Sequence, residues 1–275
     1  MKKEESSCNA KFWQPKIEED ITFYKAHLNN YSFDKHVHEH YTISVIKDGV
    51  MDAFMHGKIL HVNSLNIAML NPDEVHSNAS EPTKDYKHFS LYFSKEYVNK
   101  LRDIGLPRQE VVFKESTLND ICLAQKLISL IEQDEKGIIS KLDFESKLVS
   151  YINELILKNT STKNLEKLTN HEIMIERAKE YINDNYSLDL SLEDIAKELD
   201  ISKYHFLRLF KEKTFISPHA YLMARRVEKA RESLQGGKKI IQSAYESGFH
   251  DQSHLNRRFK SVFGITPKQY QDCFK

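Results

Sequence analysis

Four histidines in the first third of this sequence have a spacing that suits ligand or metal binding. His36, His38 and His40 alternate along one short segment, and His76 follows the turn-forming residues 71–74. Imidazole nitrogens brought together across neighbouring strands are ready metal ligands, and they also hydrogen-bond organic molecules. The pattern therefore predicts a binding site. In the alternative in which the site holds a metal ion, the ligands are His36, His38 and His76.

A second group of functional side chains belongs to an internal repeat near the C-terminal end. Residues 205–211 and 254–260 have similar sequences, each followed by an Ile-Ser-Pro or Ile-Thr-Pro segment. The offset between the two copies stays at 49 residues, from His205 and His254 as far as the prolines. Agreement at so many positions with one constant offset indicates a duplicated supersecondary unit.

Each copy has the pattern of a short helix, a tight turn and a second helix. In the first copy, apolar residues at helical spacing precede Asp200, and Ser202 is placed to cap the next helix. In the second copy, Gly248 permits the turn and Asp251 is placed as the cap. Two helices joined by a tight turn, repeated along the chain, are the layout of paired helix-turn-helix motifs.

The outward faces of the second helices carry residue types that suit DNA. Arginine bonds a guanine edge with two donors, asparagine and glutamine do so for adenine, and lysine neutralises phosphates. Leu207 is apolar, so it can meet only a thymine methyl group. The alternative is a helical bundle whose polar faces are merely solvated. The expected DNA-contacting residues are Ser202, Lys203, Tyr204, His205, Leu207, Arg208, Lys211, Gln252, Ser253, Asn256, Arg257 and Lys260.

The distribution of charge favours the DNA-binding alternative. Basic and acidic residues balance at 40 each over the chain, but residues 201–275 carry 15 Lys and Arg against 6 Asp and Glu. That segment has a net charge of +9, which leaves −9 on residues 1–200. Such an asymmetry is the electrostatic footprint expected of a domain that binds a polyanion.

The spacing of apolar residues predicts the elements that hold these side chains. Residues 36–93 contain short apolar runs separated by turns, a pattern typical of an antiparallel sheet closed into a barrel or a sandwich. Over residues 117–158 the spacing changes to three and four, which predicts two amphipathic helices for domain packing or a dimer interface. The polar residues 159–170 are predicted to be a linker, and Thr169 with Glu172 has the capping-box pattern of a new helix.

The C-terminal repeat resembles the signature of the AraC/XylS family of transcription regulators. The likeness is carried by residues 195–211 and, above all, by Ala244-x-x-x-Gly248-Phe249 through Phe259-Lys260-x-x-Phe263-Gly264-x-x-Pro267-x-x-Tyr270. In that family two recognition helices of one monomer enter successive major grooves, held by a connecting helix that here would span residues 218–235. The resemblance implies a sequence-specific regulator, usually an activator, with RNA polymerase and a small-molecule effector as partners.

Residues 20–95 resemble the cupin-type sensor domain of the same family, through the histidine segment 36–41 and the segment 71–76. In metal-binding cupins a glutamate follows the first histidines, whereas the segment 41–43 here is Tyr-Thr-Ile. The sequence therefore predicts an organic effector and no cofactor, with a metal-dependent cupin enzyme fused to a DNA-binding domain as the alternative. Strand alternation and an approximate alignment with sugar-binding relatives give the expected ligand-binding residues His38, His40, Lys47, His76, Asn78, His88 and Ser90.

These patterns together predict an α+β protein of two domains. The expected parts are a cupin-like β-barrel domain for sensing and dimerisation (1–160, barrel about 20–95, helices within 117–158), a linker (159–170) and an all-α tandem helix-turn-helix domain (171–275, motifs about 191–213 and 239–263). No apolar stretch suits a secretory signal or a membrane span, and the cysteines lack disulfide or zinc-site spacing. We expect a cytoplasmic homodimer bound to double-stranded DNA.

Overall fold

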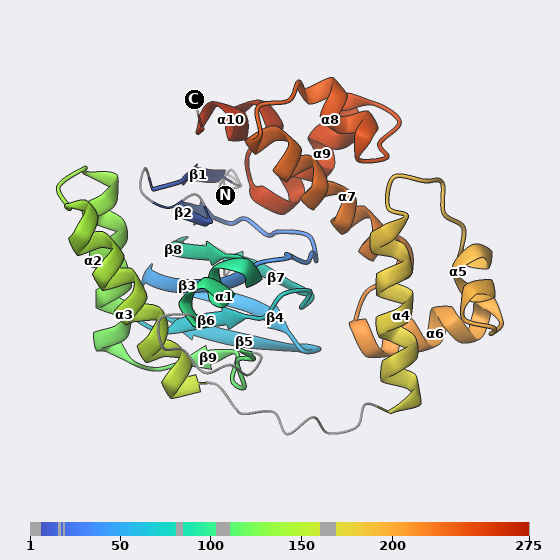
Figure 1. Cartoon of the computed structure of the whole chain (residues 1–275), viewed down its shortest axis with the longest axis horizontal. Coiled ribbons are helices and arrows are strands. Elements are labelled where there is room, and N and C mark those ends of the chain that lie inside the picture. The colour runs from blue at the N-terminus through green and yellow to red at the C-terminus, as the bar shows by residue number, and fades with distance from the viewer. Residues whose placement is uncertain are drawn as a thin grey trace, which may run out of the picture.

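The computed structural model describes residues 7–15, 18, 20–80, 85–102, 111–159 and 169–274. It contains a β domain within residues 7–159 and a helical domain within residues 169–274, so the predicted two-domain α+β class is confirmed (Figure 1). Residues 160–168, most of the predicted linker, lie outside the described residues. Among the helices that the structure describes, none is both long and apolar enough to cross a bilayer.

The β domain is built from two antiparallel sheets whose side chains meet around one cavity. The strand order is β1-β2-β8-β3-β6-β9 in the larger sheet and β5-β4-β7 in the smaller one. The bounds are β1 Ser7–Trp13, β2 Ile21–Asn29, β3 Tyr41–Asp48, β4 Val50–Met55, β5 Lys58–Asn63, β6 Ile67–Leu70, β7 His76–Ser80, β8 Asp85–Phe93 and β9 Thr117–Leu118.

Alternate residues of the larger sheet face two different cores, because successive side chains of a pleated strand point to opposite sides. In β3, Tyr41, Ile43 and Val45 are buried in a core shared with helices, while Thr42 and Ser44 line the cavity. The helices that cover this first face are α1 (Lys95–Arg102), α2 (Ile121–Glu135) and α3 (Lys141–Asn159). The second face is left for the smaller sheet and the helical domain.

The helical domain holds two helix-turn-helix units on either side of one long helix. Its bounds are α4 Asn170–Asp184, α5 Leu192–Glu198, α6 Lys203–Thr214, α7 Pro218–Gln235, α8 Ile240–Glu246, α9 Gln252–Phe263 and α10 Pro267–Asp272. The capping box predicted at Thr169 and Glu172 is present at the start of α4. Ser202 and Asp251 accept backbone hydrogen bonds as the N-caps of α6 and α9.

The two units pack differently against the β domain. The first unit, α5 and α6, shares a core with α4 and the start of α7. The second unit, α8 and α9, is continuous with the core of the β domain, where the Phe12 ring of β1 packs edge-on against Phe263 and Tyr270. In Figure 1 the second unit accordingly lies beside β1 and β2, whereas α5 and α6 lie at the far edge of the molecule.

Candidate ligand cavity and nucleic-acid interface

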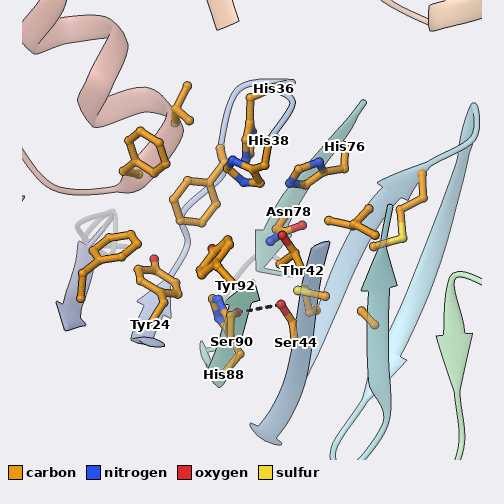
Figure 2. Close-up of a pocket in the computed structure, with 18 residues that line it drawn as sticks. Tyr24, His36, His38, Thr42, Ser44, His76, Asn78, His88, Ser90 and Tyr92 are labelled. Atoms are coloured by element: carbon orange, nitrogen blue, oxygen red, sulfur yellow. Dashed lines mark hydrogen bonds between the residues drawn. The ribbon is translucent and has the colours of Figure 1, made fainter. Parts of the chain in front are cut away.

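A small cavity lies between the two sheets and under the end of α9. Its free volume is about 30 Å³, enough for one or two water molecules and too small for an organic effector. Figure 2 shows the polar side chains that converge on it. The lining residues are Phe12, Tyr24, Phe33, His36, His38, Thr42, Ser44, Met51, Met55, Ala68, Leu70, His76, Asn78, His88, Ser90, Tyr92, Val262 and Phe263.

Three histidines form one end of this cavity. His36 and His38 come from the segment before β3, and His76 is the first residue of β7. Reciprocal backbone hydrogen bonds of 2.9 and 3.0 Å between His36 and His76 hold the two residues side by side. Burial lowers the pKa of His36 to about 3 and lowers that of His38 and His76 as well, so the cluster is uncharged at neutral pH.

The other end of the cavity contains buried polar atoms that the protein leaves unsatisfied. The hydroxyls of Ser44 and Ser90 are 2.7 Å apart and bond each other (Figure 2). Thr42 Oγ1, Asn78 Oδ1 and His88 Nδ1 are buried and have no hydrogen-bond partner within the described part of the chain. Each such atom costs about 1–3 kcal/mol, so a molecule that bonds them is favoured over an apolar one.

The structure brings five of the seven expected ligand-binding residues to the cavity and leaves two outside it. His38, His76, Asn78, His88 and Ser90 line it. His40 lies in an open cleft between the domains, because β3 begins only at Tyr41 and the predicted alternation does not extend back through the loop. Lys47 is exposed and forms an ion pair with Glu132 of α2.

The connecting helix α7 is clamped onto the β domain by charged side chains. Arg225 is buried and pairs with Glu39 and Asp73, and Lys229 also pairs with Glu39 at 3.0 Å. We call this set, together with Glu228 and Arg231, the α7 clamp. It joins residues that are far apart in the sequence, and the sequence analysis did not identify it.

Glu228 is the centre of the α7 clamp. Its side chain is 1% exposed and accepts two hydrogen bonds from Arg231, of 2.7 and 3.1 Å. His38 Nδ1 and His40 Nδ1 lie 3.5 and 3.6 Å from its carboxylate oxygens. Burial alone would raise the pKa of Glu228, but Arg231 and the two histidines hold it well below its usual value. A charged carboxylate of the helical domain therefore faces the cavity histidines.

A signal for the clamp was present in the sequence of α7. Arg225, Glu228 and Arg231 recur every three residues and lie among buried apolar residues such as Leu222, Val227 and Leu234. Charged side chains that lie among the buried apolar residues of a helix need partners of opposite charge, because an unpaired buried charge is costly. The signal could have predicted that such partners exist, but it could not have named them.

The expected DNA-contacting residues lie on the outer sides of α6 and α9. Tyr204 is 76% exposed, and Arg208 and Arg257 are also exposed. Of the others, Ser202, His205, Lys211, Ser253 and Lys260 are exposed, and Lys203, Leu207, Gln252 and Asn256 are half-buried. Ser202 caps α6, and Lys203 forms an ion pair with Glu193. The β domain therefore leaves the polar sides of both helices accessible.

Helix α9 is nevertheless attached to the β domain along its other side. The Tyr31 hydroxyl donates a 3.1 Å hydrogen bond to the carbonyl of Lys260, and Arg258 lies 3.7 Å from Asp34. Val262 and Phe263, in its last turn, close the cavity. One helix thus offers a polar face to solvent and an apolar end to the cavity.

Comparison with known proteins agrees with this arrangement. A model of the AraC-like ligand-binding domain matches residues 19–148, and a helix-turn-helix domain model matches residues 195–272. The multiple antibiotic resistance protein MarA of Escherichia coli is 31% identical over 112 residues, which are 40% of this chain and 84% of MarA. The chain belongs to the AraC family. It is a DNA-binding transcription regulator with an N-terminal ligand-binding domain.

One further relative and one solved structure span most of this AraC-family regulator. YbfI of Bacillus subtilis, named as an uncharacterized HTH-type transcriptional regulator, is 26% identical over 230 residues, 81% of each chain. ToxT of Vibrio cholerae has a TM-score of 0.59 at 17% identity, covering 98% of this chain and 97% of ToxT. The second likeness shows the two-domain fold alone. The family is regulatory, and the comparisons do not support the cupin-enzyme alternative.

Proposed function

We propose that this regulator responds to a small, uncharged effector that occupies the cavity and thereby changes the position of α9. The observation that carries the proposal is the mixed wall of the cavity, in which Val262 and Phe263 of α9 close a space lined by the β domain. About 30 Å³ admits no organic molecule, so an effector that enters must displace part of that wall. Such a ligand binds the open arrangement better and shifts the population toward it.

The lining residues favour an effector that combines apolar surface with a few hydrogen-bonding groups. Among the described residues that line the cavity, none is Lys, Arg, Asp or Glu, and burial lowers the pKa of His88 to about 3, so this ring is neutral. ToxT has been crystallised with an unsaturated fatty acid. In this chain a carboxylate would meet no cation inside the cavity, and we therefore infer a neutral ligand that bonds Thr42, Asn78 and His88.

DNA contact is assigned to the outer sides of α6 and α9. Exposed Arg208 and Arg257 suit bidentate bonds to guanine, and Asn256 and Gln252 suit adenine. Tyr204, Leu207 and Ser253 also face the bases, and Ser202, Lys203, His205, Lys211 and Lys260 serve the backbone phosphates. The domain division proposed is 1–160 for sensing, 159–170 as the linker and 171–275 for DNA binding.

The same proposal includes a homodimer formed through α2 and α3, RNA polymerase as a partner, and action as an activator in the cytoplasm, without enzymatic activity. Support for the dimer comes from large apolar side chains on these helices that face solvent, with exposures of 54% for Ile121, 73% for Leu142 and 69% for Leu157. Large solvent-facing apolar side chains on a pair of helices suit a protein–protein contact. Sedimentation of Leu142→Lys beside the unmodified protein tests the dimer, which the substitution should dissociate.

A screen of neutral metabolites by thermal shift, followed by DNA-binding titrations, tests the effector site. A true effector should change DNA affinity in the unmodified protein, and Ser90→Val should abolish its binding, because Ser90 bonds Ser44 inside the cavity. Ser64→Val, at an exposed hydroxyl on the Gly49 carbonyl, is the matched control and should respond normally. DNA affinity and transcription that stay constant with every bound ligand would contradict the proposal.

A further inference from the structure

The three histidines at one end of the cavity form a compact set of donor atoms. One ring nitrogen of His36, one of His38 and one of His76 lie within 4.8 Å of one another, and all three residues are buried. The ring centroids are 4.2 Å apart for His36 and His76, 4.8 Å for His36 and His38, and 5.0 Å for His38 and His76. Figure 2 shows the rings side by side.

Hydrogen bonds orient two of the rings as metal ligands are oriented. His36 Nδ1 lies 2.6 Å from the carbonyl oxygen of Asp34, and His76 Nδ1 lies 3.0 Å from that of Glu74. A carbonyl only accepts, so each Nδ1 carries the hydrogen and each Nε2 has a free lone pair. Metal-binding histidines typically donate their other ring nitrogen to a carbonyl or a carboxylate in this way.

The third ring is oriented by the helical domain. His38 Nδ1 lies 3.5 Å from Glu228 Oε2, and Arg231 holds that carboxylate with two hydrogen bonds. His38 therefore also offers Nε2, backed by a carboxylate as in the carboxylate–histidine–metal arrangement. The sequence lacks the glutamate that follows the histidines in metal-binding cupins, but the fold supplies a carboxylate from α7 behind the histidines.

The chemistry of the site selects one class of ion. Neutral imidazole is the form of histidine that ligates a metal ion, and each of these rings can present Nε2 with a free lone pair. Nitrogen donors suit zinc and its neighbours in the first transition row, whereas magnesium and calcium require oxygen ligands. Zinc–nitrogen bonds are about 2.0–2.1 Å long, so binding draws together three nitrogens that now lie within 4.8 Å of one another.

We propose that His36, His38 and His76 bind one divalent ion of the zinc class through Nε2, and that Glu228 is a positioning residue for His38. The ion leaves an open coordination position toward the cavity. It also links the β domain to α7 through His38, Glu228 and Arg231. The site goes beyond the proposed function, since the ion can bind whether or not an organic effector enters the other end.

Titration of the metal-free full-length protein with Co²⁺ and Zn²⁺ tests the site. We expect one ion per chain, Co²⁺ absorption bands of a nitrogen-ligated site, and displacement of Co²⁺ by Zn²⁺ measured against a chromophoric chelator. His76→Ala should remove the absorption. His61→Ala, at a histidine whose side chain is 67% exposed and pairs with Asp52, is the matched control and should leave it unchanged.

The variant Glu228→Gln tests whether Glu228 positions His38 for metal binding, because glutamine has nearly the same size and shape as glutamate. It should keep the stoichiometry at one ion and weaken Zn²⁺ binding by about 10–100-fold. Unchanged affinity would overturn the role of Glu228. The site would be overturned if the unmodified protein showed no Co²⁺ absorption bands, or if His61→Ala and His76→Ala lost the absorption equally. If His76→Ala fails to fold, the spectrum of the unmodified protein still tests the site. DNA binding by the same metal-free sample is measured in parallel. It tests the proposed regulatory function separately from the metal site.

Discussion

The two helix-turn-helix units have the same local design but different tertiary surroundings. Both place a capped helix, α6 or α9, with an exposed arginine toward solvent. The core of the first unit contains one buried β-domain side chain, Val37, whereas the core of the second unit includes Phe12, Tyr24 and other β-domain residues. The two copies of the DNA-binding motif thus differ: the first packs mainly within its own domain, and the second contributes Val262 and Phe263 to the candidate ligand cavity.

Under the proposed function, this difference predicts that regulation acts mainly through the second unit. We expect the first unit to keep its core when the cavity changes, because none of its described residues lines the cavity wall. The second unit cannot move without disturbing Val262 and Phe263. We therefore expect cavity occupancy to change the contribution of α9 to DNA binding and to leave that of α6 nearly constant.

The largest expected effect comes from Phe263→Ala. Phe263 is buried where α9 meets the cavity and packs on Phe259 and Phe12, so its removal should cost about 3–5 kcal/mol of unfolding free energy, measured in urea. Phe210→Ala in the core of the first unit should cost as much. Only Phe263→Ala should increase binding of the apolar dye ANS to the folded protein. Equal dye binding by both variants would contradict the division between the units.

A smaller effect is expected when the α7 clamp loses Arg225. Its guanidinium bonds Glu39 and Asp73, and Arg225→Ala should lower the unfolding free energy by about 1.5–3 kcal/mol. Lys238→Ala is the matched control, because its pair with Glu246 is exposed and should be worth at most about 1 kcal/mol. A control that costs as much as Arg225→Ala would mean that the clamp does not hold the domains together.

DNA affinity provides the next test. Arg257→Ala and Arg208→Ala should each weaken specific binding by about 1–3 kcal/mol and relax preference at one base pair. Each substitution is also combined with Arg225→Ala. The binding free energy lost through Arg257→Ala should then change, whereas the losses from Arg208→Ala and Arg225→Ala should add to within about 0.5 kcal/mol. Equal losses on specific and scrambled DNA would reject base contact, and equal coupling for both arginines would remove the asymmetry between the units.

The smallest effect concerns pH, because the two recognition helices have different caps. Asp251 caps α9, and its bond from the His254 amide lowers its pKa below 3.8, whereas Ser202 of α6 does not titrate in this range. A carboxyl group whose pKa is lowered by folding stabilises the fold above pH 3.8. That stabilisation is lost as the pH falls through the lowered pKa. The difference in Tm between the unmodified protein and Asp251→Asn should therefore shrink from pH 6 to pH 2. A Tm difference that stays constant from pH 6 to pH 2 would contradict the role of Asp251 as a charged cap.

Local patterns were enough to predict the helical domain in some detail. Thr169 with Glu172, Ser202 and Asp251 cap the helices where their side chains can reach the free backbone amides, because capping depends on neighbours within three residues. The repeat between His205 and His254 has the same local basis. The ligand site was harder to predict, since it is assembled from several strands and α9, and Lys47 and His40 lie outside the cavity.

The sequence by itself determined the class of this protein, its paired helix-turn-helix units and the presence of a polar site among its histidines. Those features depend on residue types and on spacings within single elements. Only the tertiary structure decided that Glu228 faces His38, that Arg225 reaches Glu39, and that α9 closes the cavity. The reason is physical, because side chains this far apart in sequence meet only after two domains have buried a shared core, and no local pattern encodes that meeting.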